Sequence, residues 1–275
     1  MRSTVALSPV ETRAADSLYT EHFIDAGGVR IRYIEAGVGN PGPPLVLLHG
    51  FQAGADYWLP HPLPLLAREF RIIAPDLPGF GSSGRLAKYS LDSYAECLLA
   101  FLDVLGVGQA YLLGHSMGAQ IGIALAVKSS DRVTKLLLVD SAGLPRTGPA
   151  WTAPLQMLTD ASTYHYKLYP KMFRLARKST ALRECLLMIR DEHVTDYLRK
   201  LHMPVLIIWG SRDRVVPLEH GSFLARNIPG ARLAIIRGAG HMPFYQKPEQ
   251  FTDLVLHFLK ANEEQTQQRQ GSLEP

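Results

Sequence analysis

The chain has 275 residues, of which 47% are hydrophobic and 20% are charged, and its formal net charge at pH 7 is +4. This length fits a single α/β domain with a substantial core, and the composition is ordinary for a soluble globular protein. No stretch approaches the roughly 20 apolar residues of a membrane span, and the basic residues lack an interleaved nucleic-acid-binding motif, which argues against an integral membrane protein and against a nucleic-acid partner.

The two ends of the chain, residues 1–19 and 262–275, are predicted to be poorly ordered. The first segment has no continuous apolar core and therefore does not resemble a signal peptide, and the second is rich in Gln and Glu. The two cysteines, Cys97 and Cys185, lie in apolar helical patterns without metal-ligand spacing, so we expect buried free thiols. These features favour a cytoplasmic protein.

Residues 20–35 predict a β-hairpin, because two strand-like runs flank the turn sequence Asp25-Ala26-Gly27-Gly28. Continuously apolar runs, which are typical of strands covered on both faces in a parallel sheet, follow at 45–48, 71–74, 110–113, 135–139, 205–209 and 233–236. Helical patterns lie between most of these runs, at 90–105, 217–226 and 248–260. The alternation predicts an α/β fold with a mostly parallel, doubly wound sheet.

One segment, residues 143–202, contains no strand-like run. It shows two amphipathic stretches instead, 165–178 and 181–201, and we predict that it forms a helical cap inserted in a core of residues 20–142 and 203–261. Between Gly143 and Met203 there are ten Lys or Arg and five Asp or Glu. We interpret this excess as a solvated helical face; a basic rim that attracts anionic substrates or membrane surfaces is the alternative.

The pentapeptide Gly114-His115-Ser116-Met117-Gly118 has the G-x-S-x-G pattern and stands directly after the predicted strand 110–113. An apolar helical run follows it, and strand–turn–helix is the context in which this pattern forms a nucleophile elbow. Such a turn strains the serine backbone, and small flanking residues allow the strand and the helix to approach closely. We predict that Ser116 is a catalytic nucleophile; an exposed serine in a glycine-rich turn is the alternative.

A serine nucleophile needs a base within reach and a group that orients the base. Asp213 and His241 each follow a predicted parallel strand, at the sheet edge where open α/β folds place their sites. We predict that His241 is the base and Asp213 the acid, with Asp140, which ends the predicted strand 135–139, as the alternative acid. His115 is not expected to be the base, because neighbouring side chains at an elbow point in different directions.

The chain resembles the α/β-hydrolase fold superfamily, in its cap-bearing esterase, lactonase and C–C hydrolase branch. The signatures that carry the resemblance are Leu48-His49-Gly50-Phe51, Asp76-Leu77-Pro78-Gly79-Phe80-Gly81-Ser82-Ser83, Gly114 to Gly118, and Gly240-His241-Met242-Pro243. The order Ser, Asp, His along the chain is also the order found in α/β-hydrolases. The resemblance covers about residues 20 to 260, and it implies an eight-stranded sheet and an oxyanion hole in which Phe51 and Met117 donate backbone N–H groups.

The resemblance also narrows the reaction. The serine at position 116 argues against haloalkane dehalogenases and epoxide hydrolases, whose members use an aspartate there. C–C hydrolases of the meta-cleavage type usually carry a tryptophan after the catalytic histidine and a longer cap, whereas Met242 follows His241 here. We predict a hydrolase that cleaves a carboxylic ester or lactone through an acyl-enzyme. A C–C hydrolase of meta-cleavage-type dienoates and a hydrolase-fold ligand receptor with slow turnover are the alternatives.

The candidate substrate-binding residues come from three predicted segments. These are the oxyanion loop, which contains His49, Gly50 and Phe51, the cap, and the loop of the predicted catalytic histidine. Aromatic residues of the cap suit an apolar or aromatic substrate group, and His49 is expected to brace the oxyanion loop through hydrogen bonds. The candidates are His49, Gly50, Trp151, Tyr166, Tyr169 and Met242. The sequence has no H-E-x-x-H or other metal-ligand spacing, so we expect no metal, and we also expect no cofactor. The expected substrate is a small-molecule ester or lactone, and the expected oligomeric state is a monomer or homodimer.

Overall fold

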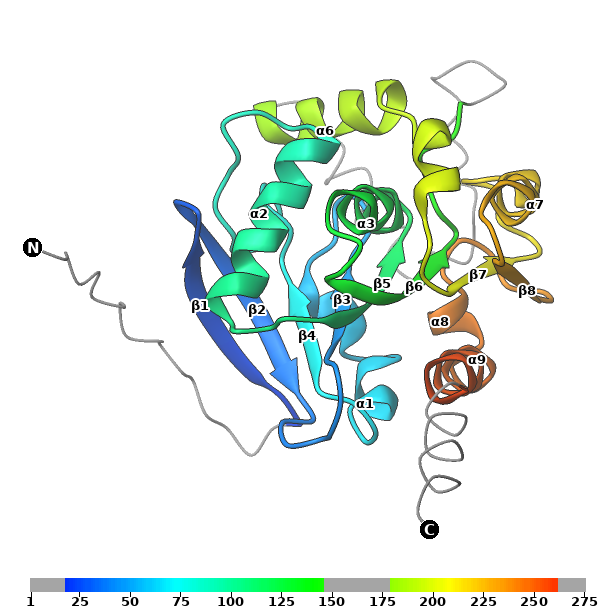
Figure 1. The fold of residues 1–275 in the computed structure, drawn as a ribbon, viewed down its shortest axis with the longest axis horizontal. Helices are drawn as coiled ribbons and strands as arrows, with labels where there is room; N and C mark the ends of the chain where they lie inside the picture. Colours follow the sequence, from blue (N-terminus) through cyan, green and yellow to red (C-terminus); the bar gives the residue numbers. More distant parts are fainter. Residues whose placement is uncertain (1–17, 146–178, 262–275) are drawn as a thin grey trace, which may run out of the picture.

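A computed structural model describes residues 18–145 and 179–261. Its centre is one sheet of eight strands in the order β1-β2-β4-β3-β5-β6-β7-β8 (Figure 1). Strands β3 to β8 run parallel to one another, whereas β2 pairs antiparallel with both β1 and β4. The strands are β1 (Thr20–Ala26), β2 (Val29–Ala36), β3 (Leu45–Leu48), β4 (Ile72–Pro75), β5 (Ala110–His115), β6 (Val133–Val139), β7 (Val205–Gly210) and β8 (Arg232–Ile236). The predicted α/β class and mostly parallel sheet are confirmed.

The predicted N-terminal hairpin is formed by β1 and β2, which are joined by Gly27 and Gly28. Both glycines have positive φ angles, +63° and +82°, a backbone conformation that a two-residue turn between twisted strands requires and that L side chains rarely adopt. The side chain of Asp25 accepts a hydrogen bond from the Gly28 N–H at 2.8 Å. The turn sequence is therefore sufficient to place the hairpin.

Helices cover both faces of the sheet, which explains why the strands are apolar at successive positions. All four residues of β3 and all six of β7 are buried, because their side chains point alternately into two covered faces. One apolar cluster takes in α2 (Leu91–Val104), α3 (Met117–Lys128), α6 (Thr180–Asp191) and α7 (Leu218–Asn227). The other takes in α1 (Leu63–Leu66), α8 (Pro243–Gln246) and α9 (Pro248–Lys260), with the 3-10 helix η1 (Ala55–Trp58).

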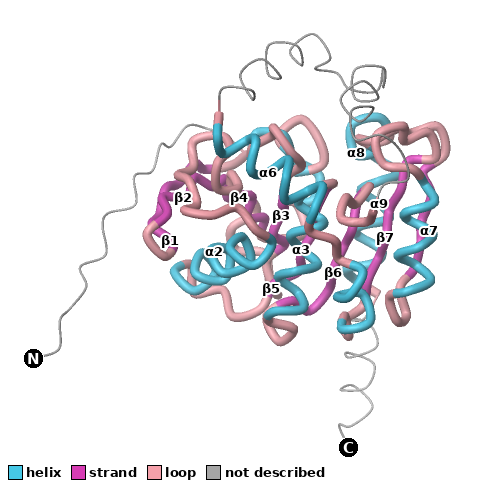
Figure 2. Tube along the Cα trace, turned by 90° about the horizontal axis from the view of Figure 1, so that it is seen from above, coloured by secondary structure: helices cyan, strands magenta, loops and turns pink. Residues whose placement is uncertain are grey.

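The sequence pattern predicts one helix over the amphipathic stretch 181–201. The structure instead has α6 followed by the 3-10 helix η2 (Thr195–Lys200). The break falls at Glu192, whose carboxylate accepts the N–H of Leu91 at the start of α2 at 2.8 Å. The carbonyl oxygen of Glu192 accepts a hydrogen bond from the side chain of Gln120 in α3 at 2.6 Å. Both views show α6 beside α2 and α3 (Figures 1 and 2). We attribute the end of α6 to these contacts with α2 and α3. The partners lie far away in the sequence, so the pattern of apolar residues within 181–201 does not reveal them.

The rest of the predicted cap, including the amphipathic stretch 165–178, lies outside the described residues, and so do nearly all of the two predicted disordered ends. Cys97 and Cys185 are both buried and free, as expected. In the two described ranges, no helix combines the length and the apolar character that crossing a membrane requires.

Candidate active site

Ser116 lies at the turn between β5 and α3 with φ 52° and ψ −114°. These angles are rare for a residue with a side chain and are characteristic of strained functional turns. The backbone N–H of Ser116 donates to the carbonyl oxygen of Val139 in β6 at 2.9 Å, which fixes the turn to the neighbouring strand. The sequence motif thus forms the strand–turn–helix that the elbow prediction requires.

Three glycines let the backbone segments around Ser116 approach one another. A Cβ atom on Gly114 would lie 2.4 Å from the carbonyl oxygen of Gly118, and one on Gly118 would lie 2.2 Å from that of Leu48. Both distances are far below van der Waals contact. A Cβ on Gly50 would lie 2.8 Å from Nδ1 of His115 and 3.5 Å from Cβ of Ser116. The loop after β3 therefore touches the elbow directly, where the predicted oxyanion hole has to be.

Asp213 and His241 are joined by a hydrogen bond between Oδ2 and Nδ1 of 2.8 Å, and the Asp213 side chain is fully buried. The other carboxylate oxygen of Asp213 accepts the N–H groups of Val215 and Val216 at 2.7 and 3.0 Å. The aspartate is thus fixed by the backbone while one oxygen faces the imidazole. Because a carboxylate accepts at Nδ1, this nitrogen carries the proton and Nε2 of the neutral ring is left as an acceptor.

Asp140, the alternative acid, lies at the end of β6 with φ 43° and is fully buried. Its Oδ1 accepts the N–H of Gly210 at 2.9 Å, so this oxygen ties β6 to the end of β7. One ligand atom each of Asp140, Asp213 and His241 lies within 4.8 Å of the others. Within the described ranges this is the one cluster of His, Cys, Asp or Glu that could hold a metal ion. One oxygen of Asp213 is hydrogen-bonded to His241 within it, and the other accepts the N–H of Val215 outside it.

His49 is fully buried, and both of its ring nitrogens are bonded to backbone groups. Nδ1 lies 2.7 Å from the carbonyl oxygen of Gly50, and Nε2 accepts the N–H of Leu77 at 2.9 Å. A carbonyl only accepts and an amide N–H only donates, so the ring is neutral with its proton on Nδ1. Burial holds the pKa of His49 below its usual value. His49 therefore joins the loop after β3 to the loop after β4 through hydrogen bonds, as a brace of the predicted oxyanion loop would.

The two predicted oxyanion donors lie in the loop after β3 and at the start of α3. Phe51 follows Gly50, and its ring packs edge-on against Phe80 with a centroid distance of 5.7 Å. Met117 is the first residue of α3, and N–H groups in the first turn of a helix have no acceptor inside that helix. The prediction that the Met117 N–H donates to an oxyanion requires this position.

An ion-pair network that the sequence does not indicate connects the oxyanion loop to the loop after β4. The buried Asp76 carboxylate accepts the N–H groups of Ala55 at 2.6 Å and Ser82 at 2.8 Å. Arg32 of β2 donates to both oxygens of Asp76 at 3.3 Å. The sequence motif contains Asp76, but Arg32 lies 44 positions away and has no local signal. Arg32 also pairs with Asp56 and Glu21.

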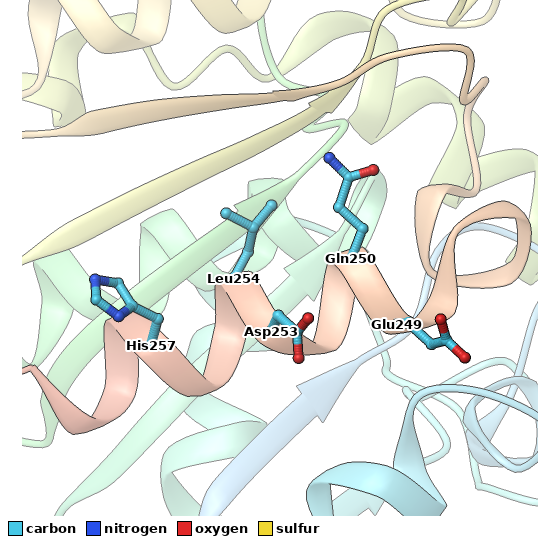
Figure 3. Close-up of a pocket in the computed structure, with 5 residues that line it drawn as sticks. All are labelled: Glu249, Gln250, Asp253, Leu254 and His257. Atoms are coloured by element: carbon cyan, nitrogen blue, oxygen red, sulfur yellow. The ribbon is translucent and has the colours of Figure 1, made fainter.

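The remaining substrate-binding candidates are Met242, which the structure describes, and three aromatic residues, which it does not. Met242 is 5% exposed and packs in the cluster of α8 and α9, while Trp151, Tyr166 and Tyr169 lie outside the described residues. A surface hollow on α9 contains none of the predicted site residues (Figure 3). Its lining residues are Glu249, Gln250, Asp253, Leu254 and His257.

Comparisons with known proteins identify the family and the fold of the chain. A model of the Alpha/beta hydrolase family matches residues 45–254. The "dihydrolipoyllysine-residue acetyltransferase component of acetoin cleaving system" of Pseudomonas putida is 34% identical over 263 residues, which cover 86% of this chain and 69% of that protein. A "2-hydroxy-6-oxo-6-(2'-aminophenyl)hexa-2,4-dienoic acid hydrolase" of Metapseudomonas resinovorans is 30% identical over 273 residues, which cover 89% and 92%. A bacterial membrane phospholipase A structure matches with a TM-score of 0.76 and 26% identity, covering 89% of this chain and 86% of that chain.

Proposed function

The chain belongs to the alpha/beta hydrolase family, and on that premise we propose that it is a serine hydrolase that cleaves carboxylic esters or lactones through an acyl-enzyme. The observation that carries the proposal is the 2.8 Å hydrogen bond between Asp213 and His241, at the sheet edge where Ser116 stands in its strained turn. A buried carboxylate, an imidazole and an elbow serine are together the parts that activate a hydroxyl nucleophile.

In this mechanism the Ser116 hydroxyl attacks the carbonyl carbon of the substrate and transfers its proton to Nε2 of His241. Asp213 keeps the ring in the tautomer in which Nε2 is the acceptor, and it stabilises the imidazolium that forms. The same proton then passes to the leaving alcohol as the acyl-enzyme forms. Water repeats the sequence against the acyl group, with His241 again as the base.

The negative charge that develops on the carbonyl oxygen is stabilised by the backbone N–H groups of Phe51 and Met117. Gly50 lets the loop of Phe51 approach Ser116, and His49 and Asp76 hold that loop from behind through backbone hydrogen bonds. Loss of one such donor costs about 2.7–4 kcal/mol of transition-state stabilisation in enzymes of this type. The site therefore combines nucleophile, base and anion stabiliser.

The second candidate function is hydrolysis of a C–C bond in a meta-cleavage-type dienoate. A relative whose name states this kind of substrate aligns with 89% of the chain at 30% identity. The residue after His241 is methionine, whereas the resemblance to these hydrolases implies a tryptophan. For this reason we place ester or lactone hydrolysis first.

The test is an activity panel of p-nitrophenyl acyl esters of increasing chain length, aliphatic lactones and a meta-cleavage dienoate, measured beside Ser116→Ala. We expect the highest kcat/KM on an ester or lactone, with repeated turnover and a burst of the first product. Ser116→Ala should lower kcat by roughly 10⁴-fold or more.

The panel separates the candidate functions. If only the dienoate is turned over, the protein is a C–C hydrolase and not an esterase or lactonase. A single turnover without cycling would indicate a ligand receptor. The serine mechanism would be contradicted if Ser116→Ala kept the wild-type rate while its circular dichroism spectrum matched that of the wild type.

A further inference from the structure

His115, the residue before the nucleophile, connects three loops of the site. It is the last residue of β5 and is 2% exposed. Its Nε2 lies 2.7 Å from the backbone carbonyl oxygen of His241, and its Nδ1 lies 3.2 Å from the hydroxyl of Tyr57. Nδ1 is also the atom that a Cβ on Gly50 would meet at 2.8 Å. The imidazole therefore touches the segments that carry the base and the oxyanion donor.

The partners of His115 determine its tautomer. A carbonyl oxygen accepts hydrogen bonds and donates none, so the proton of the neutral ring is on Nε2. Nδ1 is then an acceptor, and the Tyr57 hydroxyl donates to it. The backbone carbonyl of Tyr57 in turn accepts the hydroxyl of Tyr245 from α8 at 3.0 Å. A chain of hydrogen bonds thus runs from η1 through His115 to the loop of His241.

The surroundings of His115 oppose its protonation. Burial lowers its pKa well below the usual value for histidine, and the neighbouring His241 and His49 lower it further. Its ring centroid lies 4.7 Å from that of His241, and the Tyr57 hydroxyl also contacts its ring. In the proposed mechanism His241 becomes positively charged, so a neutral His115 can hold its backbone without competing for the proton.

We propose that His115 is a positioning residue, which fixes the backbone of His241 through an Nε2–H donor and so sets the distance between the base and Ser116. The proposal rests on the serine-hydrolase function above. It assigns His115 no contact with substrate and no proton transfer. Its effect reaches the reaction only through the position of His241, and a misplacement of about 1 Å at a reacting group can cost about 10²-fold in rate.

Two conservative substitutions separate the two ring nitrogens. A glutamine side chain at position 115 places an amide N–H near the position of Nε2, whereas asparagine is shorter and reaches only near Nδ1. His115→Gln therefore keeps a donor to the His241 carbonyl, and His115→Asn and His115→Ala remove it. The matched control is His257→Gln, the same substitution at an exposed histidine of α9, which is labelled in Figure 3.

On the ester that turns over fastest in the panel, we expect kcat to fall about 10²-fold in His115→Asn and His115→Ala, with KM changed less than about threefold. His115→Gln should recover kcat to within about threefold of wild type, and His257→Gln should match wild type. Equal kcat in the Asn and Gln variants would overturn the proposal. If the alanine variant does not fold, the Asn and Gln pair still decides.

A spectroscopic measurement tests the same proposal without turnover. In long-range ¹H–¹⁵N spectra of protein labelled at histidine, the resonance lost in His115→Gln should show the Nε2–H tautomer and no titration between pH 5.5 and 9. An Nδ1–H tautomer, or a midpoint inside this range, would contradict it. Failure of the proposed function is seen separately, as wild-type protein that a fluorophosphonate probe does not label at Ser116.

Discussion

The two carboxylates near His241 have different hydrogen-bond partners, and this difference supports the roles proposed for them. Asp213 has one oxygen fixed by two backbone N–H groups and the other bonded to the imidazole. Asp140 uses Oδ1 to accept the N–H of Gly210. The first arrangement suits the proposed role of orienting His241, and the second joins the ends of β6 and β7.

We predict that Asp213→Asn lowers kcat by on the order of 10³–10⁴-fold, because an amide can donate to Nδ1 and so stabilise the wrong tautomer. Asp140→Asn should lower kcat by less than about tenfold, because the amide oxygen can still accept the Gly210 N–H. The measurement is steady-state kinetics on one ester, with urea denaturation of each variant as the control for folding. The reverse order of the two effects would make Asp140 the acid.

At this scale the sequence predicts the residues that stand in local motifs and misses those defined by distant contacts. Ser116, Asp213 and His241 each follow a recognisable apolar strand. The hydrogen bond of Tyr57 to His115 spans 58 positions, and no sequence motif around Tyr57 predicts it. His115 itself was predictable only as a residue that is not the base.

Among the elements, the strands are predicted closely and the amphipathic stretch 181–201 is not. Strand β3 has the predicted bounds and α9 begins and ends at Pro248 and Lys260 as the sequence indicates, because two covered faces or one amphipathic face leave a direct periodic signal. The end of α6 is set by hydrogen bonds to α2 and α3. Such contacts override the local pattern, which continues past the break.

The packing of α3 against β3 provides a test at this scale. Gly118→Ala places a methyl group 2.2 Å from a backbone carbonyl of β3, whereas the Cβ of Gly122→Ala, one turn later in α3, comes no closer than 3.3 Å to a leucine side chain. We expect Gly118→Ala to lower the free energy of unfolding by about 1–3 kcal/mol or more. Gly122→Ala should change it by less than about 1 kcal/mol, since alanine also favours the helix.

The measurement is the urea midpoint of each variant at constant slope. If both alanines lower stability equally, the cost comes from filling the helix surface in general and not from the contact between the elbow and β3. An unchanged Gly118→Ala would mean that α3 and β3 are less closely packed than the structure indicates.

At the scale of the whole molecule, folding encloses two neutral histidines within the described region. His49 and His115 are 0% and 2% exposed, and burial is the main cause that lowers the pKa of each. Both pack where the oxyanion loop, the elbow and the loop of His241 meet. The unfolded chain binds protons at these histidines near pH 6.5, while the folded chain does not. The architecture that assembles the site therefore also makes the fold sensitive to acid.

The sign of this effect is fixed by proton linkage. Above pH 6.5 the two histidines are neutral in both states and contribute no pH dependence. Below it the unfolded state binds more protons, so the free energy of unfolding falls as the pH falls, by up to about 1.4 kcal/mol per pH unit for each histidine. Carboxylates add their own dependence at lower pH, so a difference between two proteins isolates the histidine contribution.

We predict that the free energy of unfolding of wild type minus that of His115→Gln is constant above pH 7 and falls by about 1.4 kcal/mol per pH unit between pH 6 and pH 5. Urea denaturation at half-unit pH steps measures this difference, and His257→Gln, at an exposed histidine, is the matched control for the substitution itself. A difference that stays flat down to pH 5 would mean that His115 binds a proton in the folded protein as readily as in the unfolded chain. In that case the imidazole could not remain a neutral support for the charged His241 during the reaction, and the Nε2–H contact would have to be explained by packing alone.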